Sequence, residues 1–591
     1  MHHKTRALER LLSASMVGAV TSVRIAFAAG GIATDGTVGP AQTLSGTNVT
    51  IPQTLGSTVG KNLFHSFSQF NVNTGQTVTF TENNTNTLDN VVSRVTGGSS
   101  SDINGTLQST PGGHANFYLI NPAGVVFGQG AQVNVPGAFH VSTADELRFK
   151  DGSKYSATHP ETSTLTSAAP ASFGFLGTSA ANNGLLKVDG AQLQTKSGQT
   201  MDMVGGKITV ENGAKLSAPS GDIRLVARQG AGDVSVEPNS QGNLPLPPDI
   251  PSAANAGTIN VQDSTLEAKG NGGGRVAVWG GNVTVKAGGK IDTSPLFVGA
   301  AGAITVRAST LTIDGQNQPG GTTGINAGAF FGDGGTVELT SAGATSISDG
   351  ASIDASSTIG NGGTVQLTSA GAMSISNGAI ISTSTFLASG NAGTVKLHAG
   401  SLIIDGQGKK TGIGSIPSPG GHAGAIEVDV DGDMSITNGA TITTSTLGAG
   451  PAGFVDVTAN GTMDISNGAV ISSSQNSKFG TGHGGTVNLT SKGAMHVSSG
   501  AVVATDTIGS GDAGAVNVHA GSLTIDGHAG ISSSSDGVGN AGTVDVTVDR
   551  AIQMTNFAGI FSFAFGAGSG GLVKVEASVL NLGDFAFISA G

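Results

Sequence analysis

Residues 364–385 contain three short pieces that read as β-strands: Thr364-Val365-Gln366-Leu367-Thr368, then Met373-Ser374-Ile375-Ser376, then, after the turn Asn377-Gly378-Ala379, Ile380-Ile381-Ser382-Thr383-Ser384-Thr385. Apolar and polar residues alternate in the first piece, and this period of two places Val365 and Leu367 on one face of a β-strand. Ile375 and Ile381 can point to the same inward side. Asn377-Gly378 supplies the positive φ that a sharp corner needs.

This unit recurs along the C-terminal part of the chain. A Gly-x-Val or Gly-x-Ile signal returns every 28 to 32 residues, by subtraction of residue numbers, at Val337, Val365, Val395, Ile426, Val455, Val487, Val516, Val544 and Val573. The second and third apolar positions follow each anchor at nearly constant offsets, so the length varies mainly in the Gly-rich loop before the next anchor. Such repeats bury their apolar face by stacking on their neighbours.

The fold expected from this repeat is all-β: a right-handed, single-stranded parallel β-helix with an N-terminal capping subdomain. A spacing of two excludes helix, whose apolar residues recur every 3.6 positions. About twenty coils at ~4.8 Å each would form a rod of roughly 100 Å.

The composition agrees with short strands separated by tight turns. Gly accounts for 96 of the 591 residues, yet hydrophobic residues still make up 37% and gather in Val/Ile-rich runs, which argues against a disordered linker. The net charge is −12, and no basic patch for nucleic acid is present. The chain has no Cys, as expected for a protein that must stay unfolded in an oxidising periplasm.

The N-terminus has the features of a signal peptide over residues 1–28. His3-Lys4-Thr5-Arg6 carries positive charge, Leu11 to Val23 is mostly apolar or small, and Ala26-Phe27-Ala28 offers a cleavage site. No later segment reaches the ~18 apolar residues of a membrane-spanning helix. We therefore expect a secreted chain, extracellular or on the bacterial surface, with no transmembrane segment.

Beyond the signal peptide, three regions are expected. Residues 29–180 form a start with a bulkier core, because ten of the 23 Phe and both Tyr lie in residues 60–175. Residues 181–255 continue the coils, with a Pro-rich excursion over 238–251, and residues 256–591 hold the regular repeat. Gly406 to Gly421 is expected to protrude as a loop.

The C-terminal end of the repeat leaves two alternatives open. Aromatic side chains could close the end of the stack, or the chain could be a fragment of a longer protein. The aromatic residues concerned are Phe557, Phe561, Phe563, Phe565, Phe585 and Phe587.

Five blocks in residues 35–180 resemble the N-terminal domain of filamentous haemagglutinin, a two-partner secretion exoprotein of the TpsA type. The residues of these blocks that could serve recognition are Asn62, Phe64, His65, Phe67 and Phe70 in the first block, Arg94, Gly97 and Gly98 in the second, and Asn121, Pro122, Gly124, Phe127 and Gly128 in the third. The blocks at Ala138 to Ala144 and Phe173 to Leu176 follow in order. Ala123 stands where the family usually has Asn.

The resemblance implies export through a cognate outer-membrane β-barrel transporter with periplasmic POTRA domains. It also implies that the passenger crosses the barrel unfolded and then acts outside as an adhesin or haemagglutinin, with host-cell or matrix glycans or proteins as partners. Turn geometry alone explains Asn121 and Gly124; direct contact with the transporter is the alternative. His65, between Phe64 and Phe67, is expected to be a packed residue rather than a base.

No catalytic, metal or cofactor site is expected. Acidic residues such as Asp349 and Asp405 occur singly beside corner glycines, where Asp commonly stabilises turns. Asp429-x-Asp431-Gly432-Asp433 resembles a Ca²⁺ loop only superficially, because Ala440 replaces the Glu at its twelfth position. The alternatives to an adhesin are a β-helical polysaccharide lyase or hydrolase, or a truncated passenger of a larger exoprotein.

Overall fold

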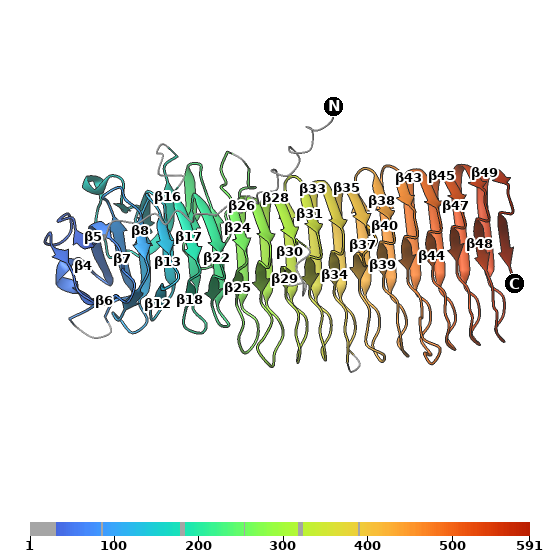
Figure 1. Cartoon of the computed structure of the whole chain (residues 1–591), viewed down its shortest axis with the longest axis horizontal. Helices are drawn as coiled ribbons and strands as arrows, with labels where there is room; N and C mark the ends of the chain where they lie inside the picture. The colour runs from blue at the N-terminus through green and yellow to red at the C-terminus, as the bar shows by residue number, and fades with distance from the viewer. Residues whose placement is uncertain (1–30, 84–86, 178–183, 253, 317–322, 388–389) are drawn as a thin grey trace, which may run out of the picture.

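The computed structural model describes residues 31–83, 87–177, 184–252, 254–316, 323–387 and 390–591, and these form a parallel β-solenoid of about 18 turns. The turns stack along one straight axis (Figure 1). At ~4.8 Å per turn the stack is roughly 85 Å long, which is shorter than the length expected from twenty coils. The predicted signal peptide lies outside the described residues.

Two faces of each turn belong to one large sheet, which has 28 strands in the described part of the chain. In several regular turns a single strand serves both faces: β33 covers the first and second pieces of residues 364–385, with a register irregularity at the corner between Ser369 and Ala372. The strands of this sheet are β1 (Ile32–Thr34), β2 (Thr43–Leu44), β4 (Ser57–Val59), β5 (Asn62–Phe70), β7 (Asn90–Val95), β8 (Ser101–Ile103), β10 (Asn116–Ile120), β11 (Val125–Phe127), β13 (Phe139–Ser142), β17 (Leu185–Asp189), β19 (Met201–Gly205), β20 (Lys207–Glu211), β22 (Asp222–Ala227), β24 (Ile259–Gln262), β26 (Arg275–Lys286), β28 (Ala303–Asp314), β30 (Thr336–Ser341), β31 (Thr345–Ser348), β33 (Thr364–Ser376), β35 (Thr394–Asp405), β37 (Ala425–Val430), β38 (Met434–Thr437), β40 (Phe454–Ala459), β41 (Met463–Ile465), β43 (Thr486–Ser498), β45 (Ala515–Asp526), β47 (Thr543–Met554) and β49 (Leu572–Leu582).

The third face consists of two parallel sheets, which contact each other through β12 and β18. The first contains β3 (Asn48–Pro52), β6 (Thr77–Thr81), β9 (Thr106–Ser109) and β12 (Gln132–Asn134). The second contains β18 (Gln192–Gln194), β21 (Lys215–Ser217), β25 (Thr265–Glu267), β27 (Lys290–Asp292), β29 (Gly324–Asn326), β32 (Ser352–Asp354), β34 (Ile380–Ser382), β36 (Gly412–Gly414), β39 (Thr441–Thr443), β42 (Val470–Ser472), β44 (Val502–Ala504), β46 (Gly530–Ser532), β48 (Gly559–Ser562) and β50 (Phe587–Ala590).

The interior is filled by the residues that alternation predicted to point inward. Val365, Leu367, Ile375 and Ile381 are all buried. Parallel pairing stacks each of them on its equivalents: Val365, for example, lies between Val337 and Val395. The predicted parallel β-helix is thus confirmed, and its core is one continuous column of Val, Ile, Leu, Ala and Met.

The corners use the backbone conformation that the turn residues predicted. Asn377 has a φ of 51° and Gly378 a φ of 91°, both in the left-handed region. The Asn377 side-chain amide donates to the carboxylate of Asp349, the residue at the same corner of the preceding turn. Asn438, Asn467 and Asn556 make similar side-chain bonds to a residue of the preceding turn.

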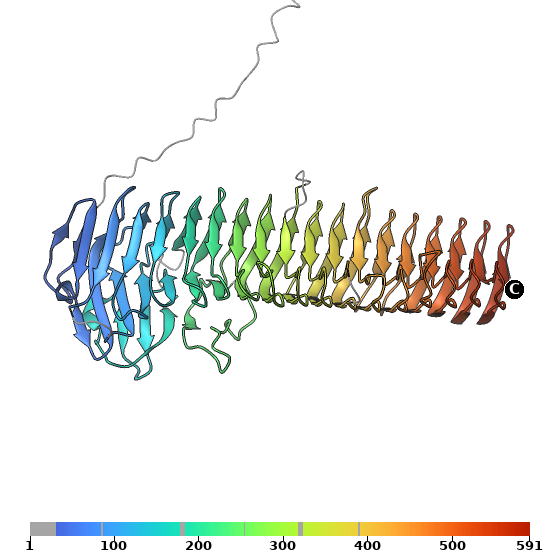
Figure 2. The ribbon, with the colours of Figure 1, turned by 90° about the horizontal axis from the view of Figure 1, so that it is seen from below.

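A second set of elements lies outside the stack at its N-terminal end. β1 pairs antiparallel with β2 and with β5, β4 also pairs antiparallel with β5, and β5 pairs in parallel with β7 of the next turn. An antiparallel sheet contains β14 (Glu146–Phe149), β15 (Lys154–Ser156), β16 (Pro170–Phe175) and β23 (Gly232–Ser235). Two short 3₁₀ helices span Gln53–Leu55 and Pro160–Thr162. Figure 2 shows the segment between β23 and β24 projecting on this side of the rod.

The prediction that Gly406 to Gly421 protrudes as a loop is wrong. β36 lies within this segment and pairs in register with β34 and β39. Only the turn around Lys409 and Lys410 is longer than in neighbouring coils. The sequence did not indicate β36 because both of its outward positions are glycines. Its single inward residue, Ile413, is not enough to give an alternating pattern.

The C-terminal aromatic residues do not cover the end of the stack. Phe585 is 80% exposed and stacks on Phe557 at a corner, with ring centroids 5.1 Å apart. Phe587 occupies an outward position of β50, directly beside Gly559 of β48. The proposed closure by these rings is wrong, because they stack along the outside of the rod instead of across its core.

Candidate functional site

The antiparallel sheet β14–β15–β16–β23 encloses a second hydrophobic core against the outer surface of the large sheet. Outward positions of β5, β7, β10, β22 and β26 are apolar or aromatic in this region, whereas the column that continues from Trp279 is polar on later turns, with Arg307, Thr340, Thr368 and His398. The side chains of this outer core include Phe64, Val92, Tyr118, Leu147, Phe149, Tyr155, Phe173, Val226 and Trp279. The bulkier N-terminal composition thus serves two cores, one inside the solenoid and one outside it.

Phe64 is the first motif residue in the outer core. Its ring lies 5.1 Å from that of Tyr155 and 5.8 Å from that of Phe149. The other predicted aromatic residues, Phe67, Phe70 and Phe127, point into the solenoid and are buried there. Phe67 and Phe70 have ring centroids 4.9 Å apart. All four aromatic residues therefore have a packing role in the folded chain.

His65 is a packed residue, as expected, and it lies in the interior of the solenoid. Its ring is fully buried, 5.2 Å from the ring of Phe80, and Nε2 lies 3.4 Å from the carbonyl oxygen of Pro52. Burial lowers the pKa of His65 to about 4, despite the opposing effect of this hydrogen bond. The imidazole is therefore neutral at physiological pH.

Asn62 begins a ladder of three asparagines on neighbouring turns. Its side-chain amide donates to the carbonyl oxygens of Thr166 and Ala168, at 2.9 and 2.7 Å. Asn90 donates to Asn62 at 2.9 Å, and Asn116 donates to Asn90 at 3.3 Å. Our sequence analysis missed Asn90 and Asn116. The signal was present, since each Asn immediately precedes an apolar run, at spacings close to one turn.

Arg94 joins segments that lie far apart in the sequence. Nε donates to the hydroxyl of Ser66 at 2.8 Å, Nη1 to the carbonyl oxygen of Ser156 and the hydroxyl of Ser163, and Nη2 to the hydroxyl of Thr37. The guanidinium carbon lies 4.0 Å from the ring centroid of Tyr155. A buried guanidinium with four hydrogen bonds fixes the cap and the antiparallel sheet onto the first turns.

Asn121 and Pro122 form a buried turn between β10 and β11. The Asn121 carboxamide accepts from the backbone N–H of Ala123 and donates to Ser99 and Ser101, each at 3.0 Å. The backbone N–H of Gly124 donates to the Asn121 carbonyl oxygen, which closes the turn. The turn is therefore complete with Ala123 at the position where the family usually has Asn.

The motif glycines serve two different purposes. Gly98 has a φ of 74° and open space around it, so the backbone conformation selects glycine there. At Gly97 and Gly128 a Cβ would lie only 1.9 and 2.0 Å from oxygen atoms of Ser68 and Asn104. Every predicted motif residue thus has a structural function in the folded chain, and the side chains are buried or confined to turns.

Sequence reasoning also missed a buried polar network beneath the antiparallel sheet. The rings of Tyr118 and His140 stack with centroids 4.3 Å apart, and His140 Nδ1 lies 2.9 Å from Asp202 Oδ2. Arg224 donates to both oxygens of Asp202, at 2.8 and 2.9 Å. Burial alone would raise the pKa of Asp202, but Arg224 and His140 hold it below its ordinary value. The four residues occupy the same column on β10, β13, β19 and β22, a relation that only strand register reveals.

Among the residues that the structure describes, no group of three His, Cys, Asp or Glu side chains is placed to hold a metal ion. In the same part of the chain, no helix has both the length and the apolar character that a membrane crossing requires.

Residues 30–278 match the family model of the TPS secretion domain. This range extends past residue 180 and includes the antiparallel sheet, the buried polar network and Trp279's neighbours on β26. Among solved structures, the secretion domain of HMW1 from Haemophilus influenzae is 17% identical, with a TM-score of 0.37 over 83% of this chain and 98% of that one. These values are too low to add to the family match. No curated protein matches the chain.

Proposed function

This chain is a two-partner secretion exoprotein, and from that premise we propose that it is exported by a cognate outer-membrane transporter and acts outside the cell as an adhesin. The transporter is of the POTRA-containing β-barrel type, and the partners outside are glycans or proteins of host cells or matrix. The observation that carries this proposal is the TPS secretion domain at residues 30–278, from which the repeat continues without a break.

The continuity between secretion domain and repeat supports a passenger built as one rod. β22, inside the matched range, pairs with β26, which pairs with β28, and β28 pairs with β30 of the regular repeat. Each of these strands forms hydrogen bonds with the turn before it and with the turn after it. We infer that the secretion domain provides the first turns on which later turns fold once they are outside.

The burial of the motif residues supports recognition before folding. Asn62, Arg94 and Asn121 are each at most 1% exposed in the folded chain, and each makes several internal hydrogen bonds. A transporter could reach these side chains only while the segment is extended. We infer that the transporter binds the unfolded segment and releases it when the same side chains become buried in the fold.

The outer surface of the rod supports adhesion by many weak contacts. One outward column of the large sheet carries Thr340, Thr368, His398, Asp429, Thr458 and Thr490 on successive turns. Such columns present hydroxyl, imidazole and carboxylate groups at a spacing of ~4.8 Å. Contacts of this kind gain strength through multivalency rather than through a single deep pocket.

Secretion and adhesion are tested separately. The chain is expressed in a Gram-negative host with and without the cognate transporter, and the culture fluid and the protease-accessible surface are assayed. We expect the chain outside only when the transporter is present. Purified chain is then applied to host cells and to extracellular-matrix proteins, and saturable binding is expected. Export without the transporter would overturn the export proposal, whereas export without binding would overturn the adhesin role alone.

A further inference from the structure

An apolar stripe runs along the loop edge of the third face and spans six consecutive turns, of which the turn of β36 contributes no side chain to it. We name it the loop-edge stripe. Its side chains are 37–71% exposed, and they are Leu296, Phe297, Val298, Phe330, Phe331, Ile359, Phe386, Leu387 and Leu447. Backbone bonds hold the loops side by side: Val298 forms a bridge with Phe331, and the N–H of Ile359 donates to Phe330.

The stripe is larger than the apolar patches of ordinary monomers. Large apolar side chains have surfaces of about 150–250 Å², and roughly half of each is exposed here, so the stripe presents on the order of 1,000 Å². The largest patch on a typical monomer covers about 300–600 Å². A stable dimer buries about 800 Å² on each partner. The stripe therefore has the area that a dimer interface needs.

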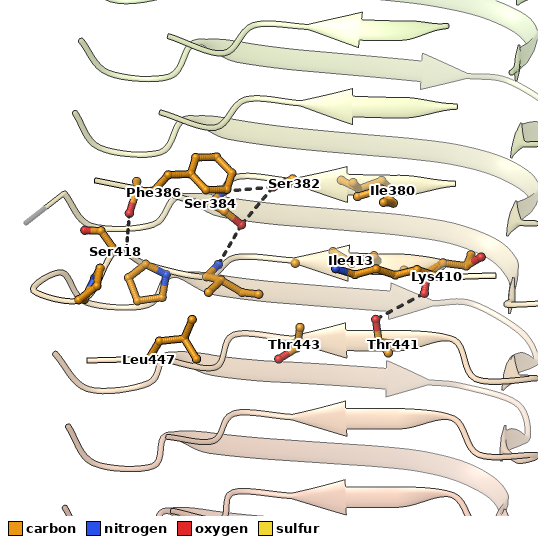
Figure 3. Close-up of a pocket in the computed structure, with 18 residues that line it drawn as sticks. Ile380, Ser382, Ser384, Phe386, Lys410, Ile413, Ser418, Thr441, Thr443 and Leu447 are labelled. Atoms are coloured by element: carbon orange, nitrogen blue, oxygen red, sulfur yellow. Dashed lines mark hydrogen bonds between the residues drawn. The ribbon is translucent and has the colours of Figure 1, made fainter. Parts of the chain in front are cut away.

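A hollow of about 500 Å³ interrupts the stripe beside Phe386 (Figure 3). Gly412 and Gly414 of β36 form its floor, because neither outward position carries a side chain. Phe386, on the turn before, and Leu447, on the turn after, form two of its walls. A Cβ at residue 414 would meet no atom within 4 Å, which shows that the hollow is open there.

We propose that the loop-edge stripe is the interface of a two-fold symmetric homodimer, in which Phe386 of each copy enters the Gly412–Gly414 hollow of the other. A protruding ring and a glycine-floored hollow on adjacent turns are complementary under a two-fold axis that passes between those turns. The partner must also present apolar groups in a straight row with the repeat distance of this solenoid. A second copy of the chain meets both requirements.

The position of this axis determines which turns face each other. The two copies run antiparallel, and the turn of Ile359 faces that of Leu447. The turn of Phe330 and Phe331 faces that of Phe479, which is 97% exposed. Large apolar residues thus meet across the interface at these two pairs of turns, and the contact is isologous and closed. This inference does not depend on the adhesin role; a dimer would double the number of adhesive columns on each particle.

The first test is the oligomeric state of the secreted chain. Sedimentation velocity over about 1–50 μM is expected to show a monomer–dimer equilibrium. Phe386→Ser should weaken it by at least about tenfold, as loss of a central aromatic residue does, and Gly414→Val, which fills the hollow, should weaken it as well. Phe565→Ser is the matched control, because Phe565 is 67% exposed but lies beyond the stripe. A chain that stays monomeric, or a dimer that Phe386→Ser leaves unchanged, would overturn the proposal.

The second test is the relative direction of the copies, and the absence of Cys from the chain makes single-site labelling simple. Spin labels are placed at Asn391→Cys and, in a separate sample, at Asn540→Cys, both on exposed loop positions. The first lies next to the proposed axis and the second about four to five turns away. The label-to-label distance along the rod should therefore be roughly 5 Å for residue 391 and 43 Å for residue 540. Equal distances at both positions would indicate parallel copies and would contradict the two-fold arrangement.

Discussion

At the scale of single residues, the family motif residues are mostly buried and make contacts inside the folded chain, so they are not exposed for recognition. The guanidinium of Arg94 is bonded to three hydroxyls and a carbonyl, which lie up to 69 residues from Arg94 in the sequence. His65 fills interior space among phenylalanine rings. Replacing either side chain is expected to lower the stability of the fold, because a buried polar group left without its partners is strongly destabilising.

Replacing Arg94 by Lys is expected to loosen the antiparallel sheet. A lysine cannot make the same set of bonds, so we expect about 2–4 kcal/mol less local stability. Hydrogen exchange of the full chain should show faster exchange in β15 and in the 3₁₀ helix Pro160–Thr162. Arg307→Lys is the control, since Arg307 occupies the same column beside Trp279 on a later turn. Equal exchange in the two variants would contradict the role given to Arg94.

His65 predicts a specific dependence of stability on pH. Its pKa is about 4 in the folded chain and 6.5 as an ordinary histidine. Between these values the unfolded chain binds a proton that the folded chain does not, so stability falls as the pH drops from 6.5 towards 4. From pH 7 to pH 5 we expect His65 to contribute a loss of about 2 kcal/mol.

The measurement is the denaturant unfolding of the wild type and of His65→Leu at both pH values. The leucine variant retains every other titrating group, so the difference between the two chains isolates His65. An identical loss in both chains would mean that His65 is not responsible for any of the pH dependence.

At the scale of elements, each turn is stabilised mainly by the turns on either side. Ile381 of β34 lies between Ile353 of β32 and Ile413 of β36, and all three are buried. Substitution in one turn should therefore affect its neighbours first and distant turns little.

Ile381→Ala is expected to cost about 2–5 kcal/mol, the usual range for removing a large buried aliphatic side chain. Hydrogen exchange should accelerate in β32, β34 and β36 and stay unchanged in β48. Ile380→Ala on the same strand provides the control, because Ile380 points outward and is 38% exposed. Uniform acceleration along the whole rod would contradict nearest-neighbour stability.

At the scale of the whole molecule, the proposed export of an unfolded chain predicts that an added disulfide would hinder export. Ser346 and Ser374 are register partners on adjacent turns, with hydroxyls 3.3 Å apart. Cysteines at both positions would close a loop of one turn in an oxidising compartment. We expect the double variant to be exported several-fold less than either single variant, and a reductant in the medium to restore export. Full export of the oxidised double variant would show that the chain need not pass in extended form.

The sequence by itself determined the coil. Alternation in Val365–Leu367, constant offsets to Ile375 and Ile381, and positive-φ residues at Asn377-Gly378 are local properties, and every turn repeats them. The same alternation did not predict the strand Gly412–Gly414, because glycines occupy its outward positions. This strand is identified only by its pairing with the strands of the two neighbouring turns.

The tertiary structure alone decided what lies outside the coil. Tyr118, His140, Asp202 and Arg224 are separated by 22 to 62 residues, and only strand register brings them into one column. Asn62 and Arg94 belong to motifs, yet their partners at Thr166 and Ser156 come from the antiparallel sheet and its loops. The physical reason is that alternation fixes which side of a strand a residue occupies, whereas the identity of its neighbour depends on how many residues each loop inserts before the next turn.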